Sequence, residues 1–145
     1  MNDANANNPD GNVIFSGTKE VAENLKFDQS RLQEWLRDSL PSAGKIIDVA
    51  QFKGGQSNPT YKIITEQKEL VLRRKPPGIL LPSAHAVDRE YKVMTALKDT
   101  AVPVPQTYGL CEDEDVIGTS FFVMDFLDGD IYWDLLLEDK SLEER

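Results

Sequence analysis

The chain has 145 residues, of which 40% are hydrophobic and 28% are charged, and this balance is typical of one small globular domain with a tail. Its 25 acidic residues outnumber its 16 basic ones, so the formal net charge is −9. Such a charge argues against nucleic acid or an anionic membrane as the main partner. Any phosphate site must therefore be a local group of basic residues.

Cysteine content and the N-terminal sequence favour the cytoplasm. Cys111 is the only cysteine, so no internal disulfide is expected, and we interpret it as a small buried side chain in a strand. No apolar run is long enough to span a bilayer. Residues 1–8 lack the basic and apolar regions of a signal or transit peptide.

The N-terminal region is predicted to contain a flexible tail and one helix. Residues 1–26 are rich in Asn, Asp and Gly, and we expect most of them to be mobile. Residues 27–130 would form the domain itself. Asp28 is a candidate N-cap, and apolar residues then recur at helical spacing up to Pro41, namely Leu32, Trp35, Leu36 and Leu40.

Three strands are predicted after this helix, over residues 45–52, 60–66 and 69–75. The short link between the second and third strands favours a tight hairpin. Pro76 ends the third strand, because proline lacks the N–H group that a sheet ladder requires.

A helix over residues 84–98 and two more strands, over 107–112 and 120–127, complete the expected domain. The helix can be capped by Ser83, and its apolar face comprises Val87, Tyr91, Met94 and Leu97. The acidic residues 112–115 lack the alternating spacing of a calcium loop, so we interpret them as a solvated turn. Together these elements predict an α+β fold with a five-stranded antiparallel sheet.

The segment FKGGQSN joins the first two strands and is a candidate phosphate-binding loop. Gly54 and Gly55 lack a Cβ, so the backbone N–H groups of this turn can approach a polyphosphate. Gln56, Ser57 and Asn58 can bond the backbone of the loop, and Ser57 could also reach a phosphate oxygen. Alone, a Gly-Gly turn between strands is more often an ordinary hairpin or bulge.

A cation and a carboxylate follow in the order that kinases use. Arg73 lies at the end of the third strand, and Glu90 lies beside the apolar face of the next helix. In kinases a cation on this strand contacts the phosphates and is held by a helix carboxylate. Arg73 and Glu90 are therefore a candidate ion pair, whereas the alternative is a solvated basic patch of Arg73, Arg74 and Lys75.

The last strand has the place of a kinase hinge, whose backbone pairs with the edge of adenine. We expect the Asp125 carbonyl and the Leu127 N–H to make these bonds, with Met124 guarding the pocket behind. The expected apolar walls for adenine are Val49, Val71, Met124 and Leu127. An aromatic-rich strand alone is more often core. The order of the parts, from glycine turn to hinge, is what indicates a kinase small lobe.

The strings GGQSNPTY, VLRRKPPG, LPSAHAVDREY, VPVP and VIGTSFFVMDFLDG resemble the aminoglycoside phosphotransferase-like kinase family. The resemblance covers residues 46–133 and is closest to the branch found as the kinase-like domain of acyl-CoA dehydrogenase family members. It implies a protein-kinase-like small lobe with one αC-type helix that binds ATP and Mg²⁺. It also implies an enzyme that phosphorylates a hydroxyl group of a small molecule. By analogy with this branch, that molecule would be a hydroxyacyl-CoA. Arg73 stands where many members have lysine, which replaces a point charge by a planar fork.

The resemblance also implies catalytic parts that are absent from this sequence. The family's large lobe carries a His-x-Asp motif and a metal-binding Asp, whereas the only histidine here, His85, precedes Ala-Val-Asp in the small lobe. We therefore expect no catalytic residue, an incomplete Mg²⁺ site, and residues 131–145 to start a large lobe. The apolar residues Tyr132 and Trp133 would then support self-association.

Two functions stay open at this stage. The first is the nucleotide-binding half of a small-molecule phosphotransferase, inactive by itself; the second is a non-catalytic nucleotide-binding or protein-interaction module. Downstream sequence with a His-x-Asp motif would separate them. A dinucleotide or P-loop site is disfavoured, because the glycines lie between two strands and no Gly-Lys-Ser/Thr follows.

Overall fold

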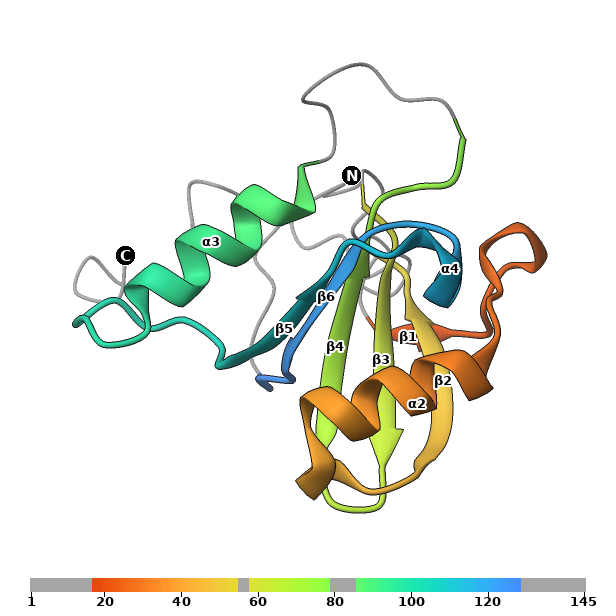
Figure 1. Cartoon of the computed structure of the whole chain (residues 1–145), viewed down its shortest axis with the longest axis horizontal. Helices are drawn as coiled ribbons and strands as arrows, with labels where there is room; N and C mark the ends of the chain where they lie inside the picture. Colours follow the sequence, from red (N-terminus) through yellow and green to blue (C-terminus); the bar gives the residue numbers. More distant parts are fainter. Residues whose placement is uncertain (1–16, 55–57, 79–85, 129–145) are drawn as a thin grey trace, which may run out of the picture.

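The computed structural model describes residues 17–54, 58–78 and 86–128, which form an α+β fold around one antiparallel sheet (Figure 1). Within these residues the sheet has six strands in the order β1-β2-β3-β4-β6-β5. The strands are β1 Thr18–Lys19, β2 Ile46–Phe52, β3 Thr60–Thr65, β4 Glu69–Arg74, β5 Thr107–Cys111 and β6 Phe121–Asp125.

The helices in the same part of the chain are α2 Gln29–Ser39, α3 Val87–Leu97, α4 Glu114–Ile117 and the short 3-10 helices η1 Glu23–Leu25 and η2 Pro41–Ala43. Asp28 caps α2 as predicted, because its carboxylate accepts a hydrogen bond from the Ser30 N–H at 2.9 Å. The expected cap of α3, Ser83, lies outside the described residues. The acidic segment is more ordered than a plain turn, since Asp113 caps the single turn of α4.

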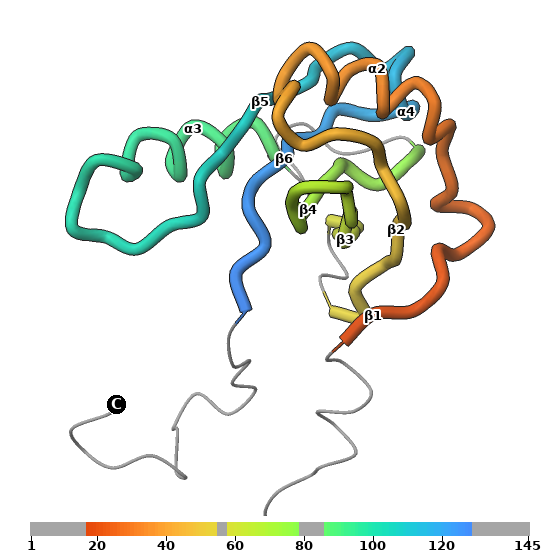
Figure 2. The backbone as a smooth tube through the Cα atoms, turned by 90° about the horizontal axis from the view of Figure 1, so that it is seen from below, coloured from red at the N-terminus to blue at the C-terminus, as the bar shows by residue number. Residues whose placement is uncertain are grey.

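Different helices bury the two faces of the sheet (Figure 2). One face, here called the α2 face, packs under α2 and includes Tyr61, Ile63, Leu70, Leu72, Phe121 and Val123. The opposite face, here called the α3 face, is partly covered by α3 and includes Val71, Phe122 and Met124. Successive side chains of a strand point to opposite faces. Whether a residue lies at an odd or an even step along its strand therefore decides which face it joins.

The sheet has one strand more than the five predicted. β1 pairs antiparallel with β2, with Thr18 opposite Phe52 and Lys19 opposite Gln51. Strand pairing at a sheet edge is made by backbone groups. A polar strand of two residues therefore leaves no apolar alternation by which the sequence could reveal it.

Part of the segment expected to be a mobile tail is held against the sheet. Residues 17–26 contain β1 and η1, and Val21 and Leu25 pack against the core of the α2 face. The Tyr61 hydroxyl also donates to the Leu25 carbonyl at 2.9 Å. The division at residue 130 stays a prediction, because residues 129–145 lie outside the described part. No helix that the structure describes is both long and apolar enough to cross a bilayer.

Candidate nucleotide-binding site

Arg73 and Glu90 form a two-pronged ion pair on the α3 face. Arg73 Nε lies 2.8 Å from Glu90 Oε2, and Arg73 Nη2 lies 3.0 Å from Oε1. β4 presents the guanidinium on this face, and the first turn of α3 presents the carboxylate. Two parallel hydrogen bonds fix the plane of a guanidinium as well as its position. The pair predicted from the sequence is therefore present, and it holds the cation in one orientation.

The end of the glycine loop is tied to the same carboxylate. Asn58 is only 5% exposed, and its Nδ2 lies 3.5 Å from Glu90 Oε1. The Thr60 hydroxyl donates to the Asn58 carbonyl at 2.9 Å and accepts from Arg73 Nη1 at 3.3 Å. Glu90 thus joins the loop to the cation. The loop's first glycine, Gly54, is described, whereas three predicted loop residues lie outside the described part: Gly55, Gln56 and Ser57.

Two of the predicted adenine-contacting residues lie side by side, and a third lies elsewhere. Val71 and Met124 are paired across β4 and β6, and both belong to the cluster on the α3 face. Val49 is paired with Ile63 and packs against the core of the α2 face. This corrects the expectation that Val49 lines the same surface as Val71. The register of β2 against β3 turns its side chain to the other side of the sheet.

β6 ends at Asp125, the residue predicted to begin the hinge. The Asp125 N–H donates to the Gln106 carbonyl at 2.9 Å, and the Phe126 N–H donates to the Glu69 carbonyl at 3.2 Å. The peptide units on either side of the Asp125 Cα therefore both donate a hydrogen bond to a neighbouring segment. Leu127 follows the strand and is 61% exposed, so its side chain buries little surface against the described residues.

Two aromatic side chains and a lysine share the α3 face with Val71. Phe52 begins the predicted loop segment, but the sequence analysis assigned none of the three a contact with the nucleotide. Phe52 and Phe126 stack with ring centroids 6.1 Å apart and an angle of 17° between their planes. Lys62 Nζ lies 4.3 Å from the Phe126 centroid and 3.5 Å from Glu69 Oε1. Lys62 pairs directly with Val71. The alternation of side chains along β3 could have indicated it, because Lys62 lies two residues after Thr60, which pairs with Arg73.

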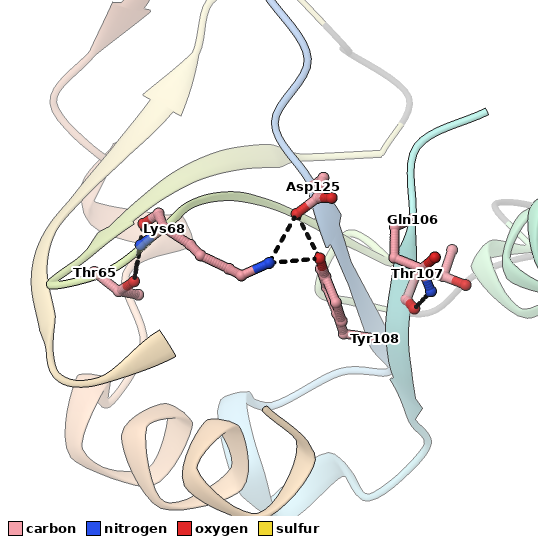
Figure 3. A network of polar contacts seen from close by, with 6 residues as sticks. All are labelled: Thr65, Lys68, Gln106, Thr107, Tyr108 and Asp125. Carbon is pink, nitrogen blue, oxygen red and sulfur yellow. Dashed lines mark hydrogen bonds and ion pairs between the residues drawn. The ribbon is translucent and has the colours of Figure 1, made fainter. Parts of the chain in front are cut away.

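A lysine, a tyrosine and an aspartate meet behind the hinge candidate, on the α2 face (Figure 3). The Tyr108 hydroxyl donates to Asp125 Oδ1 at 2.7 Å, and Lys68 Nζ donates to the Tyr108 oxygen at 3.0 Å. The hydrogen bond to Tyr108 raises the pKa of Lys68, and burial raises the pKa of Tyr108. Around neutral pH the lysine is therefore a cation and the tyrosine is a proton donor.

Metal-ligating side chains do not gather in the part of the chain that the structure describes. No group of three or more His, Cys, Asp or Glu side chains there is placed to hold an ion. Cys111 is buried, and burial raises the pKa of its thiol, which disfavours the reactive thiolate. The described site thus offers a fixed cation beside an apolar and aromatic surface, an arrangement suited to an anion attached to a flat ring.

Comparisons with known proteins point to one family. The profile of the Phosphotransferase enzyme family, APH, matches residues 48–144. Acyl-CoA dehydrogenase family member 10 of Mus musculus is 45% identical over 119 residues, which cover 81% of this chain and 11% of that protein. Acyl-CoA dehydrogenase family member 11 of Homo sapiens is 41% identical over 137 residues, which cover 90% of this chain and 18% of that protein. The chain therefore spans less than a fifth of the length of either relative.

A solved structure gives the same result for the fold. The crystal structure of a candidate aminoglycoside phosphotransferase from Ralstonia eutropha aligns with a TM-score of 0.68 and 45% identity, covering 83% of this chain and 34% of that one. The antiparallel sheet and its helices thus define a kinase-like lobe of the aminoglycoside phosphotransferase type. The chain belongs to the Phosphotransferase enzyme family. The resemblance inferred from the motif strings is confirmed, including the link to acyl-CoA dehydrogenase family members.

Proposed function

We propose that this chain is the ATP-binding lobe of a phosphotransferase that acts on a hydroxyl group of a small molecule. The observation that carries this proposal is the Arg73–Glu90 pair, which holds a guanidinium beside the end of the glycine loop. A guanidinium of fixed orientation next to a glycine-rich turn suits the phosphates of a nucleotide.

The residues on the α3 face fit the parts of ATP, which would supply the transferred phosphoryl group when bound. Arg73 and the backbone N–H groups of Gly54 and Gly55 would bind the phosphates. The expected contacts with the base are Val71, Met124 and the backbone of Asp125 and Leu127. For Mg²⁺ the described residues offer no set of three ligands, so we assign it no residue.

We assign nucleotide binding, and not catalysis, to these 145 residues. The sequence contains no His-x-Asp motif with a downstream Asn, and phosphoryl transfer requires a positioned base and metal as well as a bound donor. The acceptor is proposed only as a class. The names of the relatives favour a hydroxyl group on an acyl-CoA over one on an antibiotic, by analogy.

Calorimetric titration of ATP, with and without Mg²⁺, tests the proposal on the wild-type chain and on Arg73→Ala. The variant should bind ATP at least about tenfold more weakly, because a hydrogen bond to a charged group contributes about 1.5–3 kcal/mol. Arg37→Ala is the matched control. It removes the same charge from an exposed position in the last turn of α2, on the other side of the sheet, and should keep the wild-type affinity.

The outcomes separate three cases. Equal affinity of the wild type and Arg73→Ala would contradict the role given to Arg73. Equal losses in Arg73→Ala and Arg37→Ala would mean that only the overall charge matters. An absence of ATP binding by the wild-type chain would overturn the proposed function.

A further inference from the structure

The network of Lys68, Tyr108 and Asp125 has no part in the nucleotide contacts proposed above, yet it bears on one of them. Asp125 is paired with Leu70, a core residue of the α2 face, so its side chain lies on that face. A nucleotide on the α3 face is therefore out of reach of the carboxylate. The carbonyl proposed to contact the base, however, belongs to the same residue.

An irregularity in β5 directs the Tyr108 side chain toward this carboxylate. The register between β5 and β6 shifts between Thr107 and Gly109, which places Tyr108 at the irregularity. Bulges of this kind redirect a side chain. Gly109 beside it leaves room for α2, because a Cβ at this position would lie 3.2 Å from the ring of Trp35, which is tighter than most such contacts. The bulge and the close approach of α2 thus bring the Tyr108 hydroxyl to 2.7 Å from Asp125 Oδ1.

Lys68 supports the tyrosine from a turn that is itself well fixed (Figure 3). In the link between β3 and β4, the Thr65 hydroxyl donates to the Lys68 carbonyl at 2.8 Å and accepts from the Lys68 N–H at 3.0 Å. From there Lys68 Nζ lies 5.0 Å from the Tyr108 ring centroid and 3.9 Å from Asp125 Oδ1. Side chains from two segments, the β3–β4 link and β5, therefore converge on the carboxylate at the end of β6.

We propose that Tyr108, supported by Lys68, is a positioning residue that holds the Asp125 carbonyl in place for the edge of the base. Asp125 is the last residue of β6, and residues at the end of a strand move more freely than those in its middle. Backbone bonds restrain it along the sheet, and the side-chain bond restrains its rotation. Because the inference rests on the proposed function, it concerns the share of ATP affinity that comes from the base.

Tyr108→Phe removes the hydroxyl and keeps the ring. Calorimetry should compare ATP with inorganic tripolyphosphate, which carries the phosphates but no base. We expect Tyr108→Phe to weaken ATP binding about threefold to tenfold and to leave tripolyphosphate binding unchanged. Asp125→Ala should do the same. The double variant should lose no more than either single variant, because both changes remove the same bond.

Tyr61→Phe is the matched control. Its hydroxyl also lies on the α2 face, but it bonds to the Leu25 carbonyl in the N-terminal segment, far along the chain from the hinge. This variant should lower the melting temperature and keep the wild-type ratio of ATP to tripolyphosphate affinity.

Two results would overturn the positioning role and leave the proposed function standing. One is an unchanged ATP affinity in Tyr108→Phe, and the other is an equal loss for ATP and tripolyphosphate. A wild-type chain that binds no ATP would overturn the proposed function and the positioning role together.

Discussion

Arg73 and Arg74 are neighbours in the chain but project from opposite faces of β4. Arg73 pairs with Glu90, whereas Arg74 is only 3% exposed and lies among the residues of the α2 face. Arg74 Nε donates to the Thr119 hydroxyl at 2.8 Å, and Nη2 donates to the Ile117 carbonyl at 3.0 Å. Within the described residues its guanidinium thus donates to neutral oxygens, so its role is to join segments of the fold.

Arg74→Lys should lower the free energy of unfolding by about 2 kcal/mol. One ammonium group cannot reach all the oxygens that the planar guanidinium reaches, and a buried polar group left without a partner destabilises the fold. Urea denaturation measures the change. Arg73→Lys is the control, because its side chain is 24% exposed and should lose less stability. An equal urea midpoint for Arg74→Lys and the wild type would contradict the prediction.

The limits of site prediction are also visible at single residues. Arg73 and Glu90 could be paired from the sequence, because a cation at a strand end and a carboxylate in the following helix turn are local features. Val49 was placed in the same pocket as Val71, but it joins the α2 face. Its orientation depends on the register across the glycine loop, and loop sequence does not specify that register.

At the scale of elements, α2 shows how one side chain defines the start of a helix. Asp28 accepts hydrogen bonds from the N–H groups of Ser30 and Arg31, at 2.9 and 3.4 Å. These N–H groups have no partner inside the helix. Leu32 and Leu36 then bury one side of α2 against the sheet.

Asp28→Ala should lower the free energy of unfolding by about 1 kcal/mol through loss of the N-cap. Asp38→Ala is the control at the other end of α2, where a negative charge opposes the helix dipole, so this change should be neutral or slightly stabilising. Thermal unfolding followed by circular dichroism compares the two. Equal losses at both positions would show that charge, and not capping, is responsible.

The five predicted strands and both long helices are present, and each is shorter than expected by one or a few residues at its ends. Apolar periodicity marks them because each packs one face against a core. The elements that were missed are β1, η1, η2 and α4, which are short and polar or turn-like. They are held in place by hydrogen bonds to residues distant in the chain, such as the bond from the Gln67 N–H to the Ala43 carbonyl and that from Arg74 Nη2 to the Ile117 carbonyl. Single-sequence patterns do not record such contacts.

At the scale of the whole molecule, the buried ionisable groups predict a loss of stability at alkaline pH. Burial raises the pKa of Tyr61 above its ordinary value of 10.0 and that of Cys111 above 9.0. A group whose pKa is raised on folding contributes its full stability below its unfolded pKa, and the contribution disappears as pH rises through the folded pKa. The free energy of unfolding should therefore fall from about pH 9 upward, most steeply above about pH 10.

Urea midpoints measured from pH 7 to 11 check this expectation. Tyr61→Phe should be less stable at pH 7, since it loses the bond to the Leu25 carbonyl, but its stability should fall less steeply above about pH 10. A slope as steep as that of the wild type would exclude Tyr61 as the source of the alkaline loss.

The sequence by itself determined the family, the order of the main strands and helices, and the partnership of Arg73 with Glu90. These conclusions rest on periodicity, motif strings and spacing, which are local properties of the chain. Only the tertiary structure decided that Val49 and Arg74 belong to the α2 face, that β1 extends the sheet, and that Tyr108 meets Asp125. The physical reason is that strand register and bulges are set by packing and by backbone hydrogen bonds between distant segments, and a shift of one residue moves a side chain to the opposite face.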